Sequence, residues 1–212
     1  MRCRVWPKVL SLILGEMIKI IIITLCFGFV FIPLAWFMLP KFLEQPKYTV
    51  IKKENNLEIR RYEKILTSSV KVEGDQYFAL RKGFQPLVRY IGAKERDSEK
   101  ISMTAPVIQS VNEENEKWTI SFAMPSKYSL DNLPQPENNN IYFQEIEPSL
   151  AAVIRFNGKA DEELLNLKTD ILMRWIESKS YVNLSRPKFL FYNDPTTPGF
   201  LRRNEVMIFV EK

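Results

Sequence analysis

A charge-free apolar run near the N-terminus constrains the fold of this chain more than any other feature. From Ile20 to Leu39 no residue carries a charge, and a helix of that length reaches roughly 30 Å, the thickness of a bilayer's hydrocarbon core. The run predicts a transmembrane anchor at 20–40, between a tail (1–19) and a domain (41–212). A cleaved signal peptide or a buried core helix is the alternative, but residues 36–40 offer no small-residue cleavage site.

The side of the membrane is predicted from the basic residues around this run. Four precede it and four follow it closely: Arg2, Arg4, Lys8, Lys19, Lys41, Lys47, Lys52 and Lys53. The positive-inside counts therefore tie. Because the first four are spread along a short tail, as in a signal anchor, we expect a single-pass membrane protein whose C-terminal domain lies outside the cytoplasm.

Composition excludes several classes of function. Residues 1–40 hold four of the 30 basic residues and one of the 25 acidic ones, so the domain is nearly neutral and we expect no nucleic-acid partner. The chain has no histidine, which removes most zinc sites and His-based catalysis. Acidic pairs such as Glu162 and Glu163 need no explanation beyond solvation on a helix, so we predict no enzyme, no catalytic residue and no metal site.

The domain begins with alternating segments and an amphipathic helix. Apolar residues recur every three or four positions from Tyr77 to Ile91, which predicts a helix capped by Asp75 and ending near Gly92. Pro86 lies inside it and lacks an N–H, so we expect a kink or a break near residue 83. Alternating polarity predicts strands at 57–62, 69–73, 101–111 and 118–124.

A second half resembles the first after a loop rich in Pro and Asn at 125–140. With an offset of 84 residues, Val70 matches Ile154 and Gly74 matches Gly158. A helix over 161–179 and strands at 188–192 and 205–210 follow, although chance similarity between short apolar strands is the alternative. The halves, about 47–124 and 141–212, predict an α+β fold. In it, two pseudo-symmetric repeats form a distorted antiparallel β-barrel, flanked by two helices.

Three motifs in this order resemble the SOUL haem-binding protein family. They are Leu57-Glu-Ile-Arg-Arg-Tyr62, preceded by Tyr48-Thr-Val-Ile; Lys100-Ile-Ser-Met-Thr-Ala-Pro-Val107; and Arg202-Arg-Asn-Glu-Val206. The similarity runs from about Lys47 to Lys212. It implies a distorted barrel of two repeats that binds haem or another tetrapyrrole in a shallow apolar groove beside the first helix.

The resemblance also implies which residues bind the ligand. The helix positions that match the family's groove are Arg81, Phe84, Val88 and Arg89, where guanidinium groups would meet the porphyrin's carboxylates. The alternative is that the arginines are solvated and that Phe84 and Val88 belong to the core.

Two further residues are candidates for the same site. Met103 could offer a thioether to haem iron, although methionine in a strand is usually a packing residue. Arg202 could meet a propionate, or it could only fix the turn that leads into the last strand. Without histidine, haem would be held by another ligand or by none, so an iron-free porphyrin, a bilin or another flat apolar anion is also a candidate.

These observations favour a membrane-anchored protein that binds a tetrapyrrole for buffering, transport or handover. The alternative is an effector-binding or protein-interaction module that shares the two-repeat barrel and takes a different ligand.

Overall fold

The computed structural model describes residues 14–28, 43–94, 99–111 and 117–212. The chain divides into two compact units between Phe42 and Leu43, and the first contains a helix over 14–28. The predicted membrane span at 20–40 lies partly outside the described residues. Among the residues that are described, no helix is both long enough and apolar enough to cross a membrane.

The second unit is an α+β domain, as predicted. Its elements, in chain order, are β1 (Tyr48–Glu54), β2 (Leu57–Tyr62), β3 (Ile65–Val72), α2 (Gln76–Ile91), β4 (Val107–Val111), β5 (Trp118–Ala123), β6 (Tyr142–Ile146), β7 (Ser149–Asn157), α3 (Glu162–Ser178), β8 (Val182–Asn183), β9 (Lys188–Phe191), the 3₁₀ turn η1 (Gly199–Leu201) and β10 (Arg203–Glu211).

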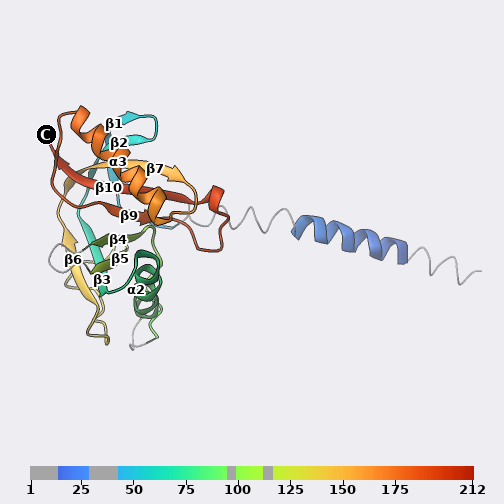
Figure 1. The fold of residues 1–212 in the computed structure, drawn as a ribbon. Coiled ribbons are helices and arrows are strands. Elements are labelled where there is room, and N and C mark those ends of the chain that lie inside the picture. Colours follow the sequence, from blue (N-terminus) through green and yellow to red (C-terminus); the bar gives the residue numbers. More distant parts are fainter. Residues whose placement is uncertain (1–13, 29–42, 95–98, 112–116) are drawn as a thin grey trace, which may run out of the picture. The chain divides into compact units, whose positions relative to one another are not determined.

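The strands form one curled antiparallel sheet (Figure 1), in the order β1-β2-β7-β10-β9-β4-β5-β3-β6, with β8 paired to the end of β10. Within the described residues, β1 and β6 each pair on one side only, so the sheet is a half-barrel with two free edges. The prediction of a barrel is corrected in this respect. Closure would need pairing between β1 and β6, whereas each of them extends the edge of a different half.

The two halves of the sheet are interlocked by an exchange of strands. Strand β2 pairs with β7 of the second half, and β6 pairs with β3 of the first. An offset of 84 residues converts the pair Tyr62–Ser149 into the pair Ile65–Ile146. Gly74 follows β3 and Gly158 follows β7. Their φ angles are both positive, 120° and 134°, and glycine adopts such angles without strain.

One helix covers each half, as predicted: α2 contacts β3 and β5, and α3 contacts β7 and β10 (Figure 1). Asp75 accepts a hydrogen bond from the N–H of Phe78, and Asp161 accepts one from that of Leu164. Helix α2 runs without a break through Pro86, so of the two expected alternatives, a kink or a break near residue 83, the break is absent. Its buried side chains, which include Ala79 and Leu87, lie against the sheet on both sides of the proline and hold both turns in place.

Apolar side chains pack on both faces of the sheet. Alternation along β10 places Val206 and Ile208 against α3, whereas Met207 lies on the opposite face. That helix-free face carries a third apolar group, which includes Tyr62, Ile108 and Leu190 and is covered partly by Leu43 and Tyr48.

Strand β4 is shorter than the predicted strand at 101–111. It begins at Val107 because the residues before it bond elsewhere: the N–H of Ile101 donates to the C=O of Ile91, and that of Ala105 to Glu44. This segment therefore stays beside the C-terminal end of α2 before it enters the sheet.

Candidate functional site

The outer surface of α2 carries aromatic and basic side chains together. Tyr77 is 63% exposed and Phe78 is 52% exposed. The Arg81 guanidinium carbon lies 5.9 Å from the centroid of the Tyr77 ring, and Lys82 Nζ lies 5.7 Å from that of Phe78. Exposed aromatic rings beside cationic side chains are typical of a binding surface.

Helical spacing extends this surface toward the C-terminal end of α2. Tyr77, Arg81, Phe84 and Val88 follow one another at intervals of four, three and four residues, so they form one stripe along the helix. We call these four residues, with Phe78, Lys82 and Arg89, the α2 patch.

The side chains of the predicted residues Phe84 and Val88 contribute both to the core and to the surface. Both are half-buried and pack against the core group under α2, and the Phe84 ring meets Phe122 edge-on with centroids 5.3 Å apart. The alternative of a packing role is therefore correct for their inner sides. Their outer sides form the apolar part of the stripe.

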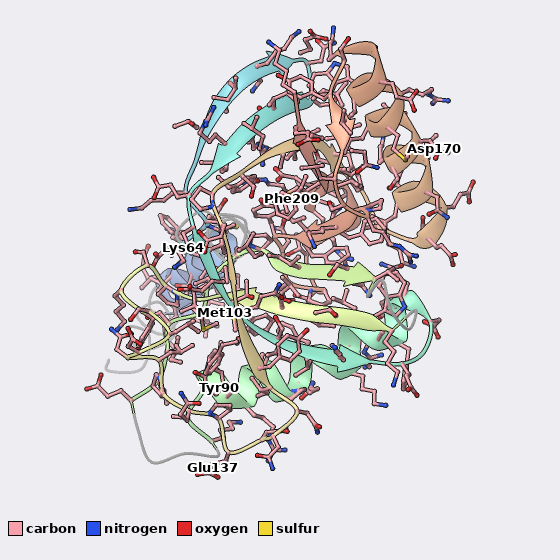
Figure 2. All side chains as sticks on the ribbon, turned by 90° about the vertical axis from the view of Figure 1, so that its left-hand side faces the viewer. Lys64, Tyr90, Met103, Glu137, Asp170 and Phe209 are labelled. Atoms are coloured by element: carbon pink, nitrogen blue, oxygen red, sulfur yellow. The ribbon has the colours of Figure 1, made fainter. Side chains whose placement is uncertain are left out.

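The remaining predicted residues lie in different places. Arg89 is exposed in the last turn of α2, and Met103, 43% exposed, follows that helix in the same half of the domain (Figure 2). Arg202 is not brought to the patch. Its Nε donates to the C=O of Thr197 at 2.7 Å and its Nη2 donates to that of Pro195, so it fixes the loop before β10.

Helix α3 provides an internal comparison, because it occupies the equivalent place in the second half. Helix α2 contains three basic residues, Arg81, Lys82 and Arg89, and no acidic one. Helix α3 contains Glu162, Glu163, Asp170 and Glu177 against Lys168 and Arg174, and Asp170 points outward (Figure 2). When the helices are aligned at their N-caps, Tyr77 and Arg81 match Glu163 and Leu167. The basic aromatic surface therefore belongs to one half only.

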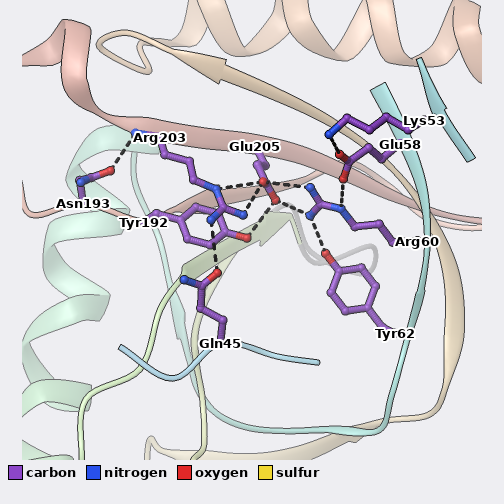
Figure 3. Close-up of polar contacts among 9 residues, drawn as sticks. All are labelled: Gln45, Lys53, Glu58, Arg60, Tyr62, Tyr192, Asn193, Arg203 and Glu205. Carbon is purple, nitrogen blue, oxygen red and sulfur yellow. Dashed lines mark hydrogen bonds and ion pairs between the residues drawn. The ribbon is translucent and has the colours of Figure 1, made fainter. Parts of the chain in front are cut away.

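A second polar centre lies buried on the helix-free face of the sheet (Figure 3). Glu205 is fully buried, and its carboxylate accepts hydrogen bonds from Arg60 at 2.7 and 3.1 Å. Arg203 donates to it at 2.7 and 3.1 Å, and the Tyr192 hydroxyl donates at 2.9 Å. Both carboxylate oxygens are thus saturated by donors, which makes this centre a fixed ion-pair network.

The pKa shifts in the network follow from burial and charge. Burial alone would raise the pKa of the Glu205 carboxyl, but the hydrogen bonds and charges of Arg60 and Arg203 outweigh it and lower that pKa. Burial raises the pKa of the Tyr62 phenol to about 12 and that of Tyr192 well above its ordinary value. Glu205 therefore stays ionised and both phenols stay neutral near pH 7, so none of them is poised for proton transfer.

The segment 43–48, which we call the strap, lies across this centre. The Gln45 side-chain oxygen accepts from Arg203 at 3.3 Å, and the Arg60 guanidinium carbon lies 4.3 Å from the Tyr48 ring centroid. Beside the strap is a cavity of about 390 Å³, bounded by Glu44–Lys47, the start of β3, residues 123–126 and 128–129, and Glu145. Its rim carries the ion pair between Lys64 and Glu145 at 2.6 Å.

Sequence reasoning missed the buried network, although a signal was present. Glu205 lies in β10 directly before a run of five apolar residues, Val206 to Val210, at a position that alternation assigns to the face of Met207. A buried carboxylate requires a cationic partner. Both of its arginines, Arg60 and Arg203, lie in the motifs that carried the family resemblance.

Comparison with known proteins assigns most of the chain to one family model. Residues 43–209 match the family described as SOUL heme-binding protein. No curated protein matches the chain in sequence. The match spans both halves of the domain, including α2 and the buried network.

Solved structures share the fold at low identity. EcmrR bound to DNA is similar with a TM-score of 0.56 and 17% identity, over 74% of this chain but only 57% of that chain. The EcmrR C-terminal domain gives a TM-score of 0.54 and 16% identity, over 78% of this chain and 98% of that chain. A protein from Listeria innocua described as a hydrolase gives 0.52 and 10%, over 76% and 94%. At these identities the likeness concerns the fold alone.

Proposed function

We propose that this chain, which belongs to the SOUL haem-binding protein family, binds haem or another tetrapyrrole on the α2 patch. In this proposal the protein buffers, carries or hands over its ligand and catalyses no reaction. Family membership supports the ligand class, and the surface of α2 supports the place. Anchoring at a membrane through residues 20–40 stays a prediction from the sequence.

The observation that carries the proposal is the difference between α2 and α3. Each helix covers one half of the same sheet. Only α2, however, has exposed aromatic rings and arginine residues and no acidic residue. Packing against the sheet does not require this difference, because the residues concerned point away from it. A ligand that is flat, apolar and anionic would account for it.

The residues of the patch fit a tetrapyrrole by their chemistry. A porphyrin presents a wide apolar disc, which the outer sides of Phe84 and Val88 would cover. Its carboxylates would pair with Arg81 and Arg89, whose guanidinium forks suit carboxylate geometry. When bound, haem would supply an iron that accepts axial ligands, and the protein's part is to hold and orient the disc.

The test is a titration of the full chain with haemin and, separately, with iron-free protoporphyrin, followed by absorbance. Replacing Arg81 and Arg89 together by Ala should weaken the binding of both porphyrins at least about tenfold, since each charged hydrogen bond contributes about 1.5–3 kcal/mol. The matched control replaces Lys168 and Arg174 of α3 by Ala. It removes two cations from the equivalent helix and should leave both affinities unchanged.

Two results would contradict the proposal. Saturable binding that is weakened equally by the α2 and α3 variants would mean that general charge, and not the α2 patch, attracts the porphyrin. A wild-type chain that binds neither porphyrin would remove the proposed ligand class.

The cavity beside the strap favours a second candidate, which is binding of a smaller effector. Its volume of about 390 Å³ lies within the range of small-molecule sites, roughly 300–1,000 Å³. Ser129 lines it, so Ser129→Trp would fill part of the space. A ligand whose binding is lost in Ser129→Trp but kept in the α2 double variant would belong to this second site.

A further inference from the structure

We infer that Tyr77 is the axial ligand that the α2 patch offers to ferric haem iron. The inference rests on the proposed function and names the group in this chain that would bind the metal. Proteins hold haem iron through His, Cys, Met or Tyr side chains. The question is which of these the described surface provides.

Elimination leaves few donors in this chain. Histidine is absent from the chain, and residues 43–212, which include the α2 patch, contain no cysteine. All eight tyrosines lie in the part of the chain that the structure describes, and Tyr77 alone among them is exposed. Hydroxyls of three others are already engaged: Tyr62 with Arg60, Tyr90 with the C=O of Pro134, and Tyr192 with Glu205.

Position supports the same residue. Tyr77 begins the stripe that continues through Arg81 and Phe84, so a disc ligated there would lie beside a guanidinium group and an apolar ring. The Arg81 guanidinium carbon lies 5.9 Å from the Tyr77 ring centroid. It places a positive charge beside the phenolate that would coordinate iron.

Oxidation state also favours tyrosine over methionine. Met103 is 43% exposed and Met173 is 37% exposed, so their thioethers are accessible. A thioether is a soft, neutral donor, whereas a phenolate is hard and negatively charged and suits Fe(III). In the ligation, the Tyr77 O–H bond breaks and its proton passes to solvent. The phenolate oxygen then replaces the water or hydroxide on iron, and no electron is transferred.

The test compares ferric haemin with iron-free protoporphyrin on the full chain. Resonance Raman should show the ring vibrations of iron-bound phenolate in the wild-type complex, together with a phenolate-to-iron absorption band. Tyr77→Phe should abolish both signals and weaken haemin binding at least about tenfold. It should leave protoporphyrin affinity unchanged, because that ligand has no iron.

Two matched variants complete the design. Tyr181→Phe removes a half-buried hydroxyl in the α3 half and should keep the phenolate signals, and Met103→Leu tests the thioether. Persistence of the signals in Tyr77→Phe, or their absence from the wild-type complex, would overturn the inference while the proposed function stands. Equal loss of both porphyrins in Tyr77→Phe would overturn the inference as well, because it would mean that the Tyr77 hydroxyl contacts the porphyrin itself and not the iron. Failure of the wild type to bind either porphyrin would remove the proposed function and this inference together.

Discussion

At the scale of single residues, the stability of the fold depends on the buried ion-pair network around Glu205. Arg60 is 2% exposed and Glu205 is fully buried. If one of them is replaced, water therefore cannot solvate the charge of the other. Replacing one partner of a buried pair leaves an uncompensated charge, which typically costs about 3–5 kcal/mol.

We therefore expect Arg60→Met, which keeps most of the side-chain volume, to lower the free energy of unfolding by about 3 kcal/mol or more. The measurement is urea denaturation of the full chain. Arg61→Met is the control: Arg61 is the next residue on β2 and is exposed, so its change should stay within about 0.5 kcal/mol. Equal denaturation midpoints for the two variants would show that the network adds nothing to stability.

Glu54 gives a prediction about pH. The Trp175 indole N–H donates to its carboxylate at 2.9 Å and Lys179 forms an ion pair at 2.9 Å, which lowers the pKa of Glu54 from 4.5 to about 2. A depressed pKa in the folded state stabilises the fold above the ordinary pKa, and this contribution is lost as pH falls from 4.5 towards 2. Trp175→Phe should raise the pKa of Glu54 in a carbon-13 NMR titration. An identical titration midpoint in the variant would exclude the indole as the cause.

At the scale of elements, the approach of α2 to the sheet depends on a glycine. A Cβ atom at Gly83 would lie 2.4 Å from Cγ1 of Ile120 and 3.1 Å from Cγ2 of Val72. Both neighbours belong to strands under the helix, so a larger side chain would push α2 away from β5 and β3.

Gly83→Ala should therefore lower the free energy of unfolding by about 1–3 kcal/mol through overpacking, although Ala favours a helix over Gly by about 1 kcal/mol. Gln85→Ala is the comparison on the exposed side of the same helix, where propensity acts alone and stability should not fall. Both are measured by thermal and urea unfolding. A Gly83→Ala variant more stable than wild type would show that the helix can shift freely.

The two helices were the elements that the sequence predicted best. Their apolar periodicity is a local signal, and Asp75, predicted as a cap, and Asp161, predicted as the first helical residue, are both N-caps in the structure. Strands β1, β6 and β8 were not predicted as strands, because β1 and β6 are edge strands and β8 has two residues. No residue of β1 or β6 is fully buried, so neither strand shows the alternation of buried and exposed positions that predicts a strand.

The sequence could predict the part of the candidate site that lies on a helix, but not the part that depends on the pairing of strands. Helical spacing and family resemblance are enough to place Arg81, Phe84 and Val88 on one stripe. Arg60 and Glu205, in contrast, lie 145 positions apart. They meet only because β7 stands between β2 and β10 in the sheet, an order that no local pattern encodes.

At the scale of the whole molecule, the exchange of β2 and β6 joins the halves of the domain into one unit. Each half completes its sheet with a strand that belongs to the other. Separation of the halves would break both pairings, and with them the contact between β4 and β9 in the middle of the sheet.

We expect the domain to unfold in one cooperative step, so that amides of β3 and β7 exchange hydrogen with the same free energy, equal to that of global unfolding. Native-state hydrogen exchange measures this, with the edge strand β1 as the internal control that should open at lower free energy. A markedly lower value for β3 than for β7 would show that the halves are independent.

Binding of the porphyrin to the α2 patch can be tested by locating the porphyrin on the molecule. Iron-free protoporphyrin is added to the isotope-labelled full chain, and backbone amide shifts are followed by NMR, because the ring current of the disc displaces the signals of nearby nuclei. If the porphyrin binds the α2 patch, the largest changes will lie in α2 between Tyr77 and Arg89, and α3 will be unaffected. If the largest shift changes lie instead around the strap and residues 123–129, and the amide shifts of α2 do not change, binding at the α2 patch is contradicted and the porphyrin binds in the cavity.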